Sequence, residues 1–284
     1  PDRLRDSSRL TGPGKLLAGR STLEPMQYKL GMVLSGGGAR GVAQIGILKA
    51  LTEQGVEVEV LAGASAGAIV AALYAAGYSG EEMLDFFVEK NPLRFSKLSM
   101  VKPGIFDTEK VVGGFLEYFP DNSFEALDKP IFLAATDIVD GRPEIFASGP
   151  LIPAILASAS TPLVFAPTEI DGHWYSDGGI TNNFPVEPLL GHCDLILGVY
   201  ATPLRRIQEK DLRSSLSVSM RAFEIGMYYS SKRKFHQCDL LLCPTELSRF
   251  GTFDAKHFEE IMRVGYRTAS EQMDSILDLV GTDR

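Results

Sequence analysis

A serine flanked by small residues stands where an expected strand at 56–62 meets an expected helix at 66–76. The turn reads Gly63-Ala64-Ser65-Ala66-Gly67. So tight a turn requires small neighbours, and it exposes the serine hydroxyl at the N-terminus of the helix, where the helix dipole favours negative charge. The pattern predicts a nucleophile elbow with Ser65 as the nucleophile. The alternative is an ordinary turn in which Ser65 caps the helix.

A glycine-rich loop, Gly36-Gly37-Gly38-Ala39-Arg40-Gly41, follows the first expected strand at 28–34. The pattern G-x-G-x-x-G serves either as a dinucleotide fingerprint or as an oxyanion hole made of bare backbone amides. A dinucleotide site needs an acidic residue at the end of the second strand. Glu57 and Glu59 fall inside or before that strand, and its end holds the serine turn. The loop is therefore interpreted as an oxyanion hole, in which Arg40 adds positive charge for an oxyanion or a phosphate head group.

A serine nucleophile needs a base, and the sequence offers few candidates. None of the four histidines has a setting typical of a catalytic residue: His173, His192, His236 and His257. Asp177-Gly178-Gly179 follows a short expected strand, but an aspartate before two glycines is by itself commonly a turn. Because His173 precedes Asp177 by four residues, it is kept as a minor candidate for a place near the site. The residues alone leave the base open.

Taken together and in this order, the three motifs resemble the signature motifs of the patatin-like phospholipase family, bacterial type. Two further segments add to the resemblance, Ser158–Pro167 before the aspartate and Asn182–Val186 after it. One departure is Phe184, which stands where many members have proline directly after asparagine. The resemblance covers about residues 28–280. It implies an α/β fold with three layers, α/β/α, around a mainly parallel central sheet.

The same resemblance implies a catalytic dyad, with Ser65 as nucleophile and Asp177 as general base, which agrees with the lack of a typical catalytic histidine. It matches Gly37, Gly38 and Arg40 to the oxyanion hole, in a loop shaped by Gly36. The other glycines of the motifs are Gly41, Gly63, Gly67, Gly178 and Gly179. The implied activity is hydrolysis of acyl esters of lipids through a covalent acyl-enzyme, without metal or organic cofactor. An acyltransferase using the same residues and a nucleotide-binding regulatory module built on the glycine loop are the alternatives.

The elements expected to position these motifs alternate along the chain, which predicts a mostly parallel sheet covered on both faces. The remaining strands are expected at 131–137, 143–147, 169–175, 195–200 and 240–243. The other helices are expected from Val42 through Leu51 and at 79–90, 153–159, 214–235 and 254–279. Residues 91–107 are expected to be irregular and are a candidate flap over the substrate.

Size and charge limit the class of protein. The 284 residues, 45% of them hydrophobic, are enough for one large α/β domain at 26–284, preceded by a flexible extension at 1–25 that is either an added leader or a mobile flap. The net charge of −8 argues against nucleic-acid binding and predicts that any membrane contact is mainly apolar and local. No apolar run approaches the ~18–20 residues that span a bilayer. A cytoplasmic protein is therefore predicted, with a peripheral position at a membrane and the oligomeric state both left open.

Three smaller features complete the sequence-based expectations. Cys193, Cys238 and Cys243 have no metal-ligand spacing and are interpreted as reduced thiols. The basic run 232–234 is interpreted as a solvated helix face, with contact to phospholipid head groups as the alternative. Four apolar residues of the same region are interpreted as core packing and not as an acyl channel: Phe223, Met227, Tyr228 and Phe235.

Overall fold

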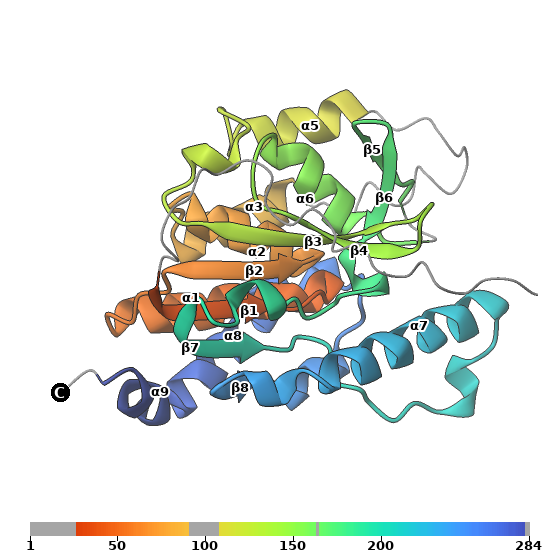
Figure 1. Cartoon of the computed structure of the whole chain (residues 1–284). Helices are drawn as coiled ribbons and strands as arrows, with labels where there is room; N and C mark the ends of the chain where they lie inside the picture. The colour runs from red at the N-terminus through yellow and green to blue at the C-terminus, as the bar shows by residue number, and fades with distance from the viewer. Residues whose placement is uncertain (1–26, 91–107, 163–164, 282–284) are drawn as a thin grey trace, which may run out of the picture.

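The computed structural model describes residues 27–90, 108–162 and 165–281. The expected extension at 1–25 and the candidate flap at 91–107 lie outside these residues. Eight strands form one sheet in the order β5-β6-β3-β2-β1-β7-β8, with β4 paired to β3 (Figure 1). The strands are β1 (Tyr28–Leu34), β2 (Val60–Ala64), β3 (Ile131–Asp137), β4 (Arg142–Phe146), β5 (Thr168–Ile170), β6 (His173–Asp177), β7 (Cys193–Val199) and β8 (Leu240–Leu242).

The sheet is parallel through its centre and antiparallel at one end. Strands β3, β2, β1, β7 and β8 are parallel neighbours, whereas β4 and β6 both pair antiparallel with β3 and β5 pairs antiparallel with β6. The expected α/β class with a mainly parallel central sheet is confirmed, and the antiparallel end is an addition to it. Because the central strands are parallel, the carboxyl ends of β1 and β2 meet at one edge, where the glycine loop and the serine turn both begin.

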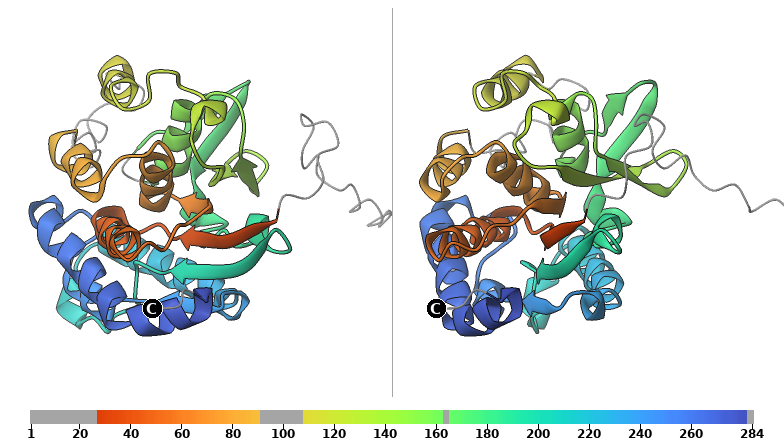
Figure 2. Two further views of the ribbon diagram at one scale, coloured as in Figure 1. Left: turned by 90° about the vertical axis from the view of Figure 1, so that its left-hand side faces the viewer. Right: turned by 60° about the vertical axis from the view of Figure 1, so that its left-hand side comes forward.

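Both faces of the central strands are buried, as near-continuous apolar sequences in parallel sheets predict. Along β1, Met32 and Leu34 enter the larger core and Val33 enters the smaller one. The larger core packs helices α1 (Ala43–Glu53), α2 (Ala66–Ala75), α3 (Gly80–Glu89), α6 (Leu151–Ala159) and α8 (Phe258–Glu271) against the sheet. Helix α7 (Ser215–Lys232) lies on the opposite side, which gives the three expected layers (Figure 2).

Several elements differ in extent from the sequence-based expectation. Strand β2 starts at Val60 and not at Val56, because its register with β1 begins where Val60 pairs with Gly31. Val56 and Val58 are nevertheless buried, and because they are apolar the sequence pattern predicted them as part of the strand. The expected helix at 254–279 is two helices, α8 and α9 (Met273–Val280), separated at Gln272. Helix α5 (Thr108–Leu116) was not expected.

Two further features concern the helices and the cysteines. Within the described ranges, no helix is long and apolar enough to cross a membrane. The three cysteines are partly buried and form no disulfide.

Candidate active site

Ser65 occupies a strained turn between β2 and α2. Its backbone has φ 53° and ψ −124°, a conformation that side-chain-bearing residues rarely adopt and that costs about 1–3 kcal/mol. The N–H of Ser65 donates a 2.9 Å hydrogen bond to Oγ of Ser158, and this hydroxyl donates in turn to the carbonyl of Ala134 at 2.6 Å. Ser158 belongs to α6, so the turn is fixed by an element 93 residues away in the sequence.

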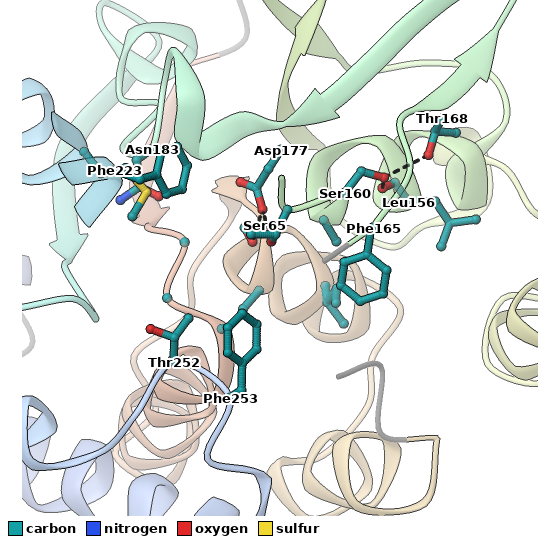
Figure 3. A pocket seen from close by; sticks show the side chains of 18 of the residues that line it. Ser65, Leu156, Ser160, Phe165, Thr168, Asp177, Asn183, Phe223, Thr252 and Phe253 are labelled. Carbon is teal, nitrogen blue, oxygen red and sulfur yellow. Dashed lines mark hydrogen bonds between the residues drawn. The ribbon is translucent and has the colours of Figure 1, made fainter. Parts of the chain in front are cut away.

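The hydroxyl of Ser65 points to a carboxylate and not to its own helix. Oγ of Ser65 donates to Oδ2 of Asp177 at 2.8 Å, and Ser65 makes no side-chain capping bond to α2 (Figure 3). Asp177 is the last residue of β6, beside Ala135 of β3. Ser65 thus occupies the N-cap position of α2 without capping the helix through its side chain, and the two motif residues lie within one hydrogen bond of each other.

The carboxylate of Asp177 is buried and surrounded by donors. Besides Ser65, Oδ2 accepts from Oγ1 of Thr161 at 2.6 Å, and Oδ1 accepts from the N–H of Gly179 at 2.7 Å. Burial raises the pKa of Asp177, and the hydrogen bonds from Thr161, Gly179 and Ser65 oppose that rise only in part. A carboxylate whose pKa is raised is a stronger base than an ordinary aspartate, which suits it to take a proton from a hydroxyl.

The glycine loop packs directly against the serine turn. A Cβ placed on Gly36 would lie 3.0 Å from Cβ of Ser65, and one on Gly41 would lie 2.5 Å from Cβ of Ala66. Gly38 has φ +57°, and a Cβ there would come within 2.3 Å of the carbonyl of Thr252. Glycine is therefore required at position 38 both by the backbone conformation and by the close approach.

Most N–H groups of this loop already have acceptors. Gly36 donates to the carbonyl of Asn183, Ala39 to that of Thr252, and Arg40 to that of Gly37. Within the residues that the structure describes, the N–H groups of Gly37 and Gly38 have no acceptor, and neither has that of Ala66 at the start of α2. These three donors are available to an oxyanion beside Ser65.

Arg40 is placed differently from the expectation. Its side chain is buried, and Nη2 donates to Oε1 of Glu224 at 3.1 Å and to Oγ1 of Thr252 at 2.9 Å. The guanidinium is thus neutralised by a carboxylate of α7, and the backbone N–H of Arg40 is used within the loop. The positive charge expected of Arg40 is therefore paired with Glu224, and Arg40 joins the glycine loop to α7.

The remaining motif glycines allow close packing around the two catalytic candidates. A Cβ on Gly63 would lie 2.5 Å from the carbonyl of Gly67, and one on Gly67 would lie 2.3 Å from the carbonyl of Leu34. A Cβ on Gly178 would lie 2.2 Å from the carbonyl of Ala134. The carboxyl ends of β1, β2 and β6 and residue Ala134 of β3 therefore meet too tightly for any side chain at these positions.

An apolar cavity of about 450 Å³ opens at Ser65 and Asp177 (Figure 3). This volume lies in the range typical of small-molecule sites. Residues from α2, α3, α5 and α6 line one part of it, and residues from α7 line another. Its apolar lining includes Ile69, Phe87, Phe115, Leu156, Phe165, Trp174, Met220, Phe223, Met227 and Phe253. None of the four histidines is among the residues lining the cavity, so His173, which lies 3.6 Å from Asp137, is not a candidate base.

Several residues at the site were not assigned from the sequence or were assigned differently. Phe223 and Met227 line the cavity, contrary to their interpretation as core, whereas Tyr228 and Phe235 pack in the smaller core as expected. Lys234 bonds to Asn182 and Glu187 and so belongs to the fold. Sequence reasoning missed the roles of Ser158, Thr161 and Glu224, because nothing local to them signals a partner 16 to 184 residues away.

Asn183 also lines the cavity and was not assigned a role. It is almost fully buried, and neither Oδ1 nor Nδ2 of its side chain has a hydrogen-bond partner in the described parts of the chain. Buried amides are nearly always hydrogen-bonded, so this side chain is available to a bound ligand.

Comparison with known proteins identifies the group to which these features belong. The sequence model of the patatin-like phospholipase family matches residues 32–190, a span that contains every motif described above. An uncharacterized NTE family protein of Mycobacterium tuberculosis is 36% identical over 174 residues, which cover 60% of this chain and 48% of that protein. Patatin-like phospholipase domain-containing protein 7 of Rattus norvegicus is 28% identical over 308 residues, covering 94% of this chain and 21% of that protein.

A solved structure shares the fold. VipD from Legionella pneumophila matches with a TM-score of 0.51 at 16% sequence identity, over 88% of this chain and 67% of that chain. The chain spans about half the length of the mycobacterial relative and about a fifth of the rat protein.

Proposed function

Because the chain belongs to the patatin-like phospholipase family, we propose that it hydrolyses acyl esters of lipids, with Ser65 as nucleophile and Asp177 as general base. The observation that carries this proposal is the 2.8 Å hydrogen bond from Oγ of Ser65 to Oδ2 of Asp177, two buried residues that line an apolar cavity. A structural serine would not need a strained backbone, a buried carboxylate partner and unpaired N–H groups beside it at the same time.

In the first half of the reaction, Oγ of Ser65 attacks the ester carbonyl carbon while its proton passes to Asp177. The carbonyl oxygen becomes an oxyanion that accepts from the N–H groups of Gly37 and Gly38, which have no acceptor among the described residues, and the N-terminus of α2 favours its negative charge. When the intermediate collapses, the bond to the alcohol oxygen breaks and Asp177 returns the proton to that oxygen. The products are the free alcohol and an acyl group on Ser65.

In the second half, water replaces the alcohol. Asp177 takes a proton from water as the water oxygen attacks the acyl carbonyl, the same N–H groups stabilise the second oxyanion, and the proton returns to Oγ of Ser65 as the fatty acid leaves. Burial of Asp177 favours the proton uptake in both half-reactions, because it raises the pKa of the base. The apolar walls of the cavity suit a hydrocarbon chain attached to the reacting carbonyl.

A fluorophosphonate probe, which forms a covalent adduct with activated serines, tests the proposal. We expect stoichiometric labelling of the wild type and none of Ser65→Ala. Asp177→Asn should label at least about 100-fold more slowly, since a general base typically contributes 10²–10⁴ in rate. Ser160→Ala is the matched control, because Ser160 also lines the cavity but its hydroxyl bonds to Leu156 and Thr168 and not to the carboxylate of Asp177. Equal labelling of Ser65→Ala and wild type would refute the assignment.

A further inference from the structure

The outward face of α7 carries an apolar stripe. Val218, Ala222, Ile225 and Tyr229 recur at intervals of four, three and four residues, a spacing that places them on one side of a helix. All four are exposed, Val218 to 48%, Ile225 to 38% and Tyr229 to 57%. We call these four residues the α7 outer stripe.

Charged groups are missing from this stripe, although a surface helix usually places them outward. The two charged residues in the middle of α7, Arg221 and Glu224, are only partly exposed; they bond to each other, and Glu224 also bonds to Arg40. Leu216, in the first turn of α7, is also exposed, but its spacing places it on the side of Met220 and Phe223 and not in the stripe. Contiguous exposed apolar surface on a folded protein marks an interaction site.

The opposite side of the same helix lines the catalytic cavity. Met220, Phe223 and Met227 of α7 are among its lining residues. Because a helix with its side chains is about 10–12 Å across, the stripe lies about one helix diameter from the cavity. The loop carrying Thr252 and the exposed, cavity-lining Phe253 adjoins α7, since Oγ1 of Thr252 contacts Glu224 at 3.4 Å.

The segment around α7 differs in charge from the rest of the chain. Residues 204–234 contain eight basic and three acidic side chains, a net charge of +5 in a chain whose net charge is −8. The basic residues flank the stripe: Arg205, Arg206, Lys210 and Arg213 precede it, and Lys232 and Arg233 follow it, all exposed. A helix with an uncharged apolar face between basic ends is the pattern of a segment that lies in an anionic lipid interface.

We propose that the α7 outer stripe docks on the surface of an anionic lipid bilayer. The apolar residues enter the boundary between head groups and acyl chains, the flanking basic residues contact lipid phosphates, and the negative remainder of the chain is repelled and stays on the aqueous side. The role of this docking rests on the proposed function, because it places the cavity next to the source of its ester substrate.

Vesicle binding tests the proposal in a Ser65→Ala background, which keeps the lipids intact. Large unilamellar vesicles of phosphatidylcholine and phosphatidylglycerol in equal amounts are sedimented with the protein, and pure phosphatidylcholine vesicles are run in parallel. We expect binding to the anionic vesicles to fall at least tenfold with Val218→Glu plus Ile225→Glu. The matched control is Val88→Glu plus Leu116→Glu, which changes the charge equally at sites exposed to 50% and 40% on α3 and α5 and should bind like the parent.

The same pairs of substitutions, made with Ser65 intact, are assayed on a water-soluble short-chain ester. We expect hydrolysis to stay within twofold of wild type, which shows that the fold and the dyad are preserved. No binding of the parent to anionic vesicles, or equal binding by the stripe variant, would overturn the proposal. A dimer seen in sedimentation velocity and abolished in the stripe variant would also overturn the proposal, because a second copy would then cover the stripe. A melting temperature that falls in the stripe variant alone would overturn it too, because another segment of the chain would then cover the stripe. Failure of ester hydrolysis in the wild type would instead contradict only the proposed function.

Discussion

Replacing Ser158 with alanine should release the turn that holds Ser65. The substitution removes the acceptor of the buried Ser65 N–H and the donor to the carbonyl of Ala134. An orphaned buried polar group costs about 1–3 kcal/mol, so we expect the free energy of unfolding to fall by about 2–4 kcal/mol. The strain at Ser65, about 1–3 kcal/mol, would then relax by moving the turn. Since a displacement of about 1 Å can cost about 100-fold in rate, fluorophosphonate labelling should slow by about that factor.

Urea unfolding and the second-order labelling rate measure the two effects. Ser176→Ala is the control, because it also removes a buried hydroxyl, one residue before Asp177. Oγ of Ser176 donates to the carbonyl of Ser160, which keeps its second bond, from the N–H of Asp177. No buried group is orphaned there, so we expect a loss of about 1 kcal/mol or less and labelling within threefold of wild type. If Ser158→Ala had the same free energy of unfolding and the same labelling rate as the wild type, the reasoning would be refuted.

Three further predictions concern the carboxylate, the glycine loop and the ion pair. Because the pKa of Asp177 is higher in the folded than in the unfolded state, the free energy of unfolding falls as the pH rises through the folded value. Asp177→Asn should therefore have a higher melting temperature than wild type at pH 7.5, and the difference should shrink as the pH is lowered. A lower melting temperature for the variant at pH 7.5 would contradict the burial argument. Gly38→Ala should slow labelling at least about 100-fold, whereas Gly226→Ala, which has open space around it, should not; equal rates would remove the loop from the mechanism. Glu224→Gln should lower the free energy of unfolding by about 3–5 kcal/mol, because it leaves the buried charge of Arg40 unpaired. Adding Arg40→Met should restore most of the lost free energy. If urea unfolding shows that the losses of the two single variants simply add in the double variant, the pair is not coupled.

Local patterns predicted the parts of the fold and site that depend on neighbours in sequence. The strands 28–34 and 131–137 have the predicted bounds, because each is an apolar run closed by polar or glycine residues. The elbow at Ser65 was found because strand, small residues and helix are contiguous. The break between α8 and α9 was missed, because Gln272 lies in an otherwise helical pattern without glycine or proline.

Contacts between distant segments had no such signal. The guanidinium of Arg40 was expected to add positive charge for an oxyanion or a phosphate head group. Its partner Glu224 could not be predicted, because it lies 184 residues away, on a helix whose inward face could not be recognised before α7 was placed. Phe223 and Met227 were interpreted as core for the same reason, since an apolar residue facing a cavity and one facing the core look alike in sequence. The antiparallel end of the sheet likewise depends on how β5 and β6 fold back on β3.

The central claim is that Ser65 carries the acyl group between the two half-reactions. Its most direct test is to mix the wild-type protein with an activated acyl ester, stop the reaction with acid within the first turnovers, and locate the acyl group by peptide mass spectrometry. We predict one acyl group per chain on the peptide containing Ser65, and no acylation of any peptide in Ser65→Ala. Acylation of a residue other than Ser65 would contradict this claim. So would turnover of the ester without an acylated Ser65 peptide, under conditions where deacylation is rate-limiting.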